Sequence, residues 1–147
     1  HVLAGTDFTE LGDRAVERGI EIAERFGARL SVLHIMPEPE VPRLYNRREI
    51  DEHLARVEAT KEQARVDLAE RVAKLSKGLQ LEVELEVRTG EPAEQMLEAA
   101  EKCGADAIVV GTSGKRGMKR WLLGSNAELV VRGAECDVIV VGRPHES

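Results

Sequence analysis

The apolar residues of this chain change repeatedly between two spacings, and this alternation restricts the fold more than any other feature. Five segments are short and apolar or alternate with a period of two, as β-strands do. These segments cover residues 2–5, 30–35, 79–87, 108–110 and 138–141. Between them, apolar residues recur three or four positions apart, which is typical of amphipathic helices. Helices are therefore predicted from about 9 to 26, from 47 to 77, from Pro92 onward, and from Ser125 to about 132.

The β-α-β-α-β-α-β-α-β order predicts an α/β fold. Right-handed crossovers between successive strands give a five-stranded, mainly parallel sheet with helices on both faces. With 147 residues the chain is a single domain, 1–147, by size. In the third strand Leu81, Val83, Leu85 and Val87 alternate with glutamates. A strand with one solvent-exposed face is predicted to lie near an edge of the sheet.

Two of the predicted helices show which side should face the sheet. The apolar side of the first consists of Leu11, Ala15, Val16, Gly19, Ile20, Ala23 and Phe26. The apolar side of the second consists of Ile50, Leu54, Val57, Ala64, Leu68, Val72 and Leu75. We expect both sides to be buried.

Polar residues are concentrated where two of the predicted strands end. Thr6 and Asp7 follow the first strand, and Gly111 follows the fourth. In parallel sheets of this kind ligands bind beyond the carboxyl ends of the strands, where the strand order reverses. Asp7 has two open interpretations: it accepts a hydrogen bond from a ribose hydroxyl across this crevice, or it is a turn or cap residue before the first helix.

A glycine-rich segment with the pattern Gly-x2-Gly-x9-Gly-Ser begins where the fourth strand ends. It is formed by Gly111, Gly114, Gly124 and Ser125. Glycine lets backbone N–H groups approach an anion without a Cβ in the way. A helix starting at Ser125 directs more N–H groups and its positive dipole end to the same place. The segment also contains four cationic residues, Lys115, Arg116, Lys119 and Arg120.

The same residues also have purely structural interpretations. Gly111 and Gly114 fit a tight turn, and Ser125 with Glu128 fits a Ser-x-x-Glu capping box. Capping uses the serine hydroxyl but leaves the first N–H groups of the helix available, so the two roles are compatible. The glycines, the helix start and the cations together favour phosphate binding.

Composition excludes several classes of function. The 21 basic and 27 acidic residues give a net charge of −6, which argues against nucleic acid as a main partner. No apolar run approaches the roughly 20 residues that span a bilayer. Cys103 and Cys136 lack metal-ligand or CxxC spacing. Because both lie among apolar residues, we expect reduced, buried thiols and a cytoplasmic protein.

Signatures of dedicated enzymes are missing. The sequence has no Gly-x4-Gly-Lys-[Ser/Thr] loop, no Gly-x-Gly-x-x-Gly and no Gly-x-Ser-x-Gly. No paired carboxylates and no nucleophile with its base can be assigned to the crevice. The sequence therefore indicates a binding protein in the first place.

Five segments in order resemble one known family. They are Thr6-Asp-Phe-Thr9, Leu33-His-Ile35, Gly90-Glu-Pro92, Val109-Val-Gly111 and Gly124-Ser125. Along nearly its whole length the chain resembles a universal stress protein domain of the nucleotide-binding branch. In that family the Gly-x2-Gly-x9-Gly-[Ser/Thr] motif separates members that hold ATP from those that do not, and here it is intact. The resemblance implies a Rossmann-like fold, for which we expect the strand order 3-2-1-4-5.

The resemblance also implies ATP in the crevice. The family's phosphate contacts correspond to Gly114, Gly124, Ser125 and Asn126. The ribose corresponds to Asp7 and Gly111, and adenine to the backbone of Ile35 with Thr6 and Val110 lining the pocket. A divalent cation, Mg²⁺ or Mn²⁺, is implied on the phosphates rather than in a site made by protein groups alone.

The chain departs from the family at three positions. Gly5 stands where the family often has proline, and we expect this to loosen the adenine side. Ser113 stands where a larger His or Arg is frequent, which removes a phosphate contact. Asp137 stands where proline is usual, directly before the last strand.

The family pairs its last strands edge to edge in a dimer. Here Val138 to Val141 would otherwise be an exposed apolar edge, so we expect a homodimer through this strand. Asp137 either weakens the pairing or adjusts where it begins.

Three functions remain open at this point. The first is a cytosolic ATP-binding stress-response sensor or regulator with slow or no hydrolysis. Its occupied state would alter a contact with a regulatory protein through the Pro37–Asn46 loop and the helix after it. The second is a slow ATPase or phosphotransferase that relies on positioning and metal. The third is a nucleotide-free dimerisation module that acts through protein contacts.

Overall fold

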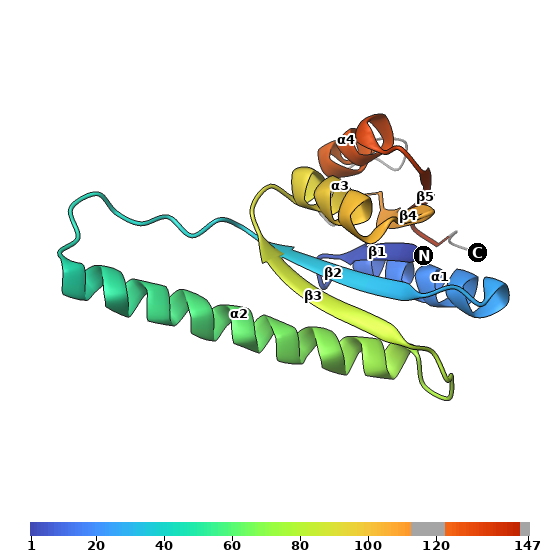
Figure 1. Ribbon diagram of the computed structural model, residues 1–147, viewed down its shortest axis with the longest axis horizontal. Coiled ribbons are helices and arrows are strands. Elements are labelled where there is room, and N and C mark those ends of the chain that lie inside the picture. The colour runs from blue at the N-terminus through green and yellow to red at the C-terminus, as the bar shows by residue number, and fades with distance from the viewer. Residues whose placement is uncertain (113–122, 145–147) are drawn as a thin grey trace.

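A computed structural model of the chain describes residues 1–112 and 123–144. The strands are β1 (Val2–Thr6), β2 (Leu30–Met36), β3 (Val83–Thr89), β4 (Ala107–Gly111) and β5 (Asp137–Val141). They form one parallel sheet in the order β3-β2-β1-β4-β5 (Figure 1). The predicted fold class and strand order are confirmed, and β3 lies at an edge of the sheet as predicted.

The helices cover both faces of this sheet. They are α1 (Glu10–Phe26), α2 (Arg47–Leu75), α3 (Pro92–Cys103) and α4 (Ser125–Gly133). In Figure 1, α1 and α2 lie on one face, and α3 and α4 lie on the other. Each pair of helices encloses its own apolar cluster, with Leu30 and Leu68 in the first and Leu33 and Ile108 in the second. The central strands are therefore buried on both faces, as parallel strands usually are.

Local signals place the helix ends close to the prediction. Thr9 is the N-cap of α1, and its hydroxyl accepts a hydrogen bond from Gly12 N at 3.3 Å. Gly27 ends α1 with a left-handed φ of 62°, which a residue with a Cβ adopts at a cost. The N-cap of α2 is Asn46, in a reciprocal capping box with Glu49. Pro92 occupies the first turn of α3, where its missing N–H has no consequence.

Several apolar residues that were expected to be buried are exposed, because they lie beyond the area that the sheet covers. Phe26 is 80% exposed because it lies in the last turn of α1, at the end of the apolar stripe. On α2 only Ala64, Leu68 and Val72 are buried, and Leu54 is 50% exposed. Figure 1 shows the first half of α2 extending beyond the sheet, where no strand lies beneath it.

The third strand also starts later than predicted. It spans Val83–Thr89 rather than 79–87, because its pairing begins where Val83 lies opposite Leu30, the first residue of β2. Within the residues described, no helix has the length and apolar character needed to cross a membrane.

Candidate functional site

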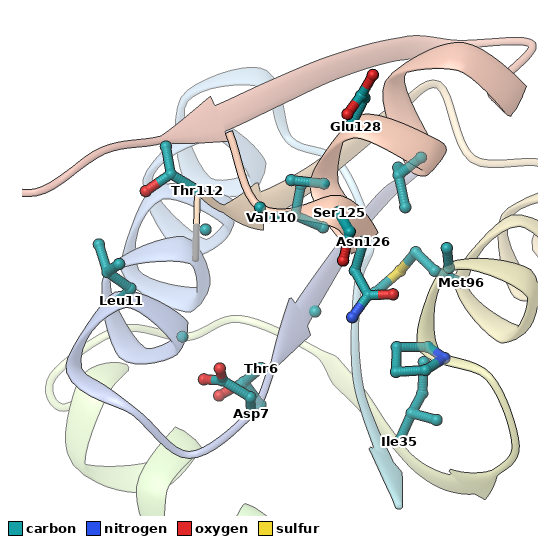
Figure 2. A pocket seen from close by; sticks show the side chains of 18 of the residues that line it. Thr6, Asp7, Leu11, Ile35, Met96, Val110, Thr112, Ser125, Asn126 and Glu128 are labelled. Carbon is teal, nitrogen blue, oxygen red and sulfur yellow. The ribbon is translucent and has the colours of Figure 1, made fainter. Parts of the chain in front are cut away.

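A cavity of about 680 Å³ lies beyond the carboxyl ends of β1 and β4, at the point where the strand order reverses. Its size falls within the roughly 300–1,000 Å³ typical of small-ligand pockets. Figure 2 shows side chains from β1, β2, β4, α3 and α4 around it. Eight of the residues predicted for the site line this cavity, namely Thr6, Asp7, Ile35, Val110, Gly111, Gly124, Ser125 and Asn126.

The ninth predicted residue, Gly114, lies outside the residues that the structure describes. The same holds for Ser113 and for the four cations at 115, 116, 119 and 120. The predicted phosphate contacts of this segment therefore stay predictions.

One end of the cavity is formed by the N-terminus of α4. Gly124 is the N-cap, and the first intrahelical hydrogen bond runs from Glu128 N to Gly124 O at 2.9 Å. The N–H groups of Ser125, Asn126 and Ala127 consequently have no acceptor within the helix. Such N–H groups, together with the positive end of the helix dipole, make a site suited to anions.

The interpretation of Ser125 as a capping residue is wrong. Ser125 is the first helical residue, and Gly124 supplies no side-chain cap. The amide of Gly124 donates to Thr112 O at 2.7 Å, which ties the start of α4 to the end of β4. An anion at this place therefore meets the amides that follow Gly124 rather than that of Gly124 itself.

The turn after β1 lies across the cavity from this helix start, as Figure 2 shows for Thr6, Asp7 and Asn126. Asp7 Oδ1 accepts hydrogen bonds from the backbone N–H of Thr9, at 3.0 Å, and from the Thr9 hydroxyl. Both bonds use Oδ1, and a carboxylate has further acceptor capacity on its second oxygen. Asp7 is exposed and lines the cavity, so its turn role leaves an acceptor available for a ligand.

Phe8 holds this turn in an unusual backbone conformation. Its φ is 64°, a left-handed value that costs a residue with a Cβ about 1–2 kcal/mol. The Phe8 ring stacks on His34 with centroids 3.8 Å apart, and the Arg71 guanidinium lies 5.0 Å from its centroid. Asp13 in turn pairs with Arg71 at 2.9 Å. These contacts from β2, α1 and α2 compensate the strain and keep Asp7 at the mouth of the cavity.

His34 links the same cluster to the backbone of the turn. Its Nδ1 lies 2.8 Å from Thr6 O, and because a carbonyl only accepts, Nδ1 carries the proton. This hydrogen bond gives His34 a structural role in the turn.

The other end of the cavity is apolar. It is lined by side chains that include Leu33, Ile35, Ala93, Met96 and Val130. Strand β1 pairs with β2 only as far as Thr6 opposite His34. On the β1 side of β2, therefore, no residue is paired with Ile35, which lines the cavity.

Among the lining residues that reasoning from sequence did not predict, Gly12 and Met96 have distinct structural roles. Gly12 supports the turn from beneath, since a Cβ on it would lie 2.6 Å from Thr6 Oγ1 and 2.7 Å from Asp7 Oδ1. Its signal was a glycine inside a helical segment, where alanine is normally preferred. Met96 projects from α3. Its place in the sequence, at the apolar spacing of a helix, does not distinguish it from an ordinary core residue.

Among the described residues that line the cavity, the titratable side chains are acidic. Asp7 and Glu128 line it. Elsewhere, Cys103 and Cys136 are free thiols as expected, but they are only partly buried rather than buried, and this partial burial raises the pKa of both. Across the part of the chain described here, no three His, Cys, Asp or Glu side chains are grouped to hold a metal ion.

Comparison with known proteins gives a consistent result. The model of the universal stress protein family matches residues 1–142. A universal stress protein of Methanocaldococcus jannaschii is 34% identical over 97% of this chain and 82% of its own length. The structure of UspA from Lactobacillus plantarum superposes with a TM-score of 0.78 at 22% identity, covering 95% of each chain, which supports the fold.

A further similar structure is a complex with a nucleotide. It is a universal stress protein in complex with cAMP, 26% identical, with a TM-score of 0.63, covering 99% of this chain and 97% of its own. The family model matches nearly the whole chain, a relative is 34% identical over 97% of it, and the fold is similar to that of a solved family member. This chain belongs to the universal stress protein family.

Proposed function

We propose that this protein is a regulator that binds ATP, with hydrolysis slow or absent. The observation that carries the proposal is that a group of hydrogen-bond donors and a carboxylate acceptor lie on opposite sides of one cavity. The N–H groups at the start of α4 suit a phosphate chain, and the Asp7 carboxylate opposite them suits a ribose hydroxyl. The similar universal stress protein in complex with cAMP supports an adenine nucleotide as the ligand.

Each part of the nucleotide has a matching part of the cavity. The phosphates would lie against Ser125 and Asn126, where Gly124 brings the backbone close. The ribose would lie near Asp7 and Gly111, and the adenine at the apolar end near Ile35, Thr6 and Val110. A Cβ on Gly111 would lie 3.2 Å from Leu11 Cβ, so this position has little room for any other residue.

A divalent cation fits this proposal as a partner of the phosphates. Asp7 and Glu128 are two carboxylates on different elements and do not form a metal site by themselves. Mg²⁺ typically binds through one or two carboxylates together with substrate phosphates. The cation would reduce repulsion between the phosphates and these acidic groups.

Isothermal titration with ATP and Mg²⁺ tests the proposal. We expect a dissociation constant below about 1 mM, with affinity falling from ATP to ADP to AMP as anionic contacts at α4 are lost. Phosphate release during the titration is expected to be negligible because the described residues that line the cavity include no His, Lys or Cys to act as a base or nucleophile. Absence of binding at millimolar ATP, or equal affinity for ATP and AMP, would contradict the proposal.

Regulation requires surfaces for partners, and two candidates are present. Strand β5 is the outer strand on its side of the sheet, and its Val138, Ile139 and Val140 are only partly buried. Pairing of two β5 edges in a homodimer would cover them. The Pro37–Asn46 loop and the start of α2 are the second candidate, with Leu44 at 96% exposure.

A further inference from the structure

Gly5 and Met96 meet at the apolar end of the cavity. Gly5 lies in β1 and Met96 in α3, and both line the cavity. A Cβ on Gly5 would lie only 2.1 Å from the Met96 Cε methyl and 3.6 Å from its Sδ. The end of the Met96 side chain therefore occupies the space that Gly5 leaves open.

Met96 is also the flexible part of an otherwise rigid wall. Its neighbours at this end are branched or small residues on strands and helix starts, including Leu33, Val110 and Ala93. Methionine is unbranched, has three side-chain torsions and a polarisable sulfur, and makes favourable contacts with aromatic rings. Figure 2 shows its thioether extending from α3 into the cavity.

We propose that Met96 is the residue that determines base preference in this pocket, a role made possible by Gly5. This inference rests on the proposed nucleotide binding and adds a specificity residue to it. The thioether forms a movable wall against which the face of the base packs. Because a purine presents a larger ring surface than a pyrimidine, this contact favours purine nucleotides.

The geometry predicts that Gly5→Ala weakens ATP binding without lowering the stability of the protein. The new methyl group clashes with the far end of a flexible side chain, which can turn away at little cost. Met96 packs in a buried cluster with Ala99, Ala100 and Val110 and also lines the cavity, so we expect the displaced methyl to move toward the cavity, into the space of the base. We expect an unchanged unfolding midpoint and an ATP affinity about tenfold lower.

Two further variants test the direction of this effect. Adding Met96→Ala to Gly5→Ala removes the displaced methyl, and we expect ATP affinity to recover by about fivefold relative to Gly5→Ala alone. Met96→Ala alone removes the wall, and we expect the preference for ATP over CTP to fall by about fivefold. As a control, Met36→Ala changes a methionine that does not line this cavity and should leave the preference unchanged.

A direct readout is the methyl resonance of Met96 in protein labelled at its three methionines, assigned by its loss in Met96→Leu. Saturation with adenosine, which lacks phosphates, is expected to shift this resonance strongly. If the unaltered chain binds ATP while adenosine leaves this resonance in place and Met96→Ala leaves the ATP-to-CTP ratio unchanged, the role of Met96 is overturned and the proposed function stands. If the unaltered chain binds no ATP, both are overturned.

Discussion

Replacing Gly12 with alanine is expected to destabilise the protein, although the same change in a helix interior normally stabilises. A Cβ at this position would lie 2.6 Å from Thr6 Oγ1, 2.7 Å from Asp7 Oδ1 and 2.9 Å from Asp7 N. The last contact is with backbone, so the turn after β1 has to move. We expect a loss of about 1–3 kcal/mol in the free energy of unfolding, opposite in sign to the gain of about 0.5–1 kcal/mol that helix propensity alone predicts.

The same displacement should reach the ligand. Thr6 and Asp7 both line the cavity, so we expect ATP affinity of Gly12→Ala to fall by about tenfold. Urea denaturation and calorimetric titration measure the two effects separately. Gly142→Ala is the matched control, because a Cβ there meets nothing within 4 Å. Stabilisation by Gly12→Ala would show that the turn adapts freely and does not define the site.

Replacing Asp7 with alanine is expected to lower ATP affinity by about 10- to 150-fold, the range for losing a hydrogen bond to a charged group. Part of this loss reflects the bonds that Asp7 Oδ1 accepts from Thr9. Asp7→Asn separates the two contributions, since its amide oxygen can still accept from Thr9 while the charge is gone. We expect Asp7→Asn to retain most of the unfolding free energy and to lose about tenfold in affinity.

Deoxynucleotides identify which ligand group Asp7 contacts. In the unaltered chain, removal of the contacted ribose hydroxyl, tested with 2′-deoxy-ATP and 3′-deoxy-ATP, should weaken binding by about tenfold. In Asp7→Ala the same ligand should bind within about twofold of ATP, because the partner is already absent. Asp51→Asn, at an exposed position of α2, serves as the control. Equal losses in both proteins would contradict a ribose role for Asp7.

The fold was predictable because its signals are local and agree with one another. Apolar strands such as Ile108–Val110, the cap at Thr9 and the stop at Gly27 lie within a few residues of the elements they define. The errors arose where burial depends on distant parts of the chain. Nothing in the spacing of Leu54 distinguishes it from Leu68, yet only Leu68 lies over the sheet.

The site was predictable to the extent that backbone chemistry defines it. Glycines, a helix start and polar residues at strand ends leave clear patterns, and Asp7, Gly111 and Gly124, which these patterns singled out, do line the cavity. Residues that act through packing leave no such pattern. Met96 has the spacing of a core residue, and the role of Gly12 depends on its closeness to Thr6 and Asp7 in the folded chain. The predicted cap was Ser125 and the observed cap is Gly124. This is a difference of one residue, which sequence patterns rarely resolve.

The central claim is that the N–H groups at the start of α4 hold the phosphates. The most direct measurement is the amide NMR spectrum of the protein titrated with ATP and, separately, with adenosine. We expect the amide resonances of Ser125 and Asn126 to shift with ATP and to change little with adenosine. Saturable ATP binding that leaves these two resonances in place would contradict the claim.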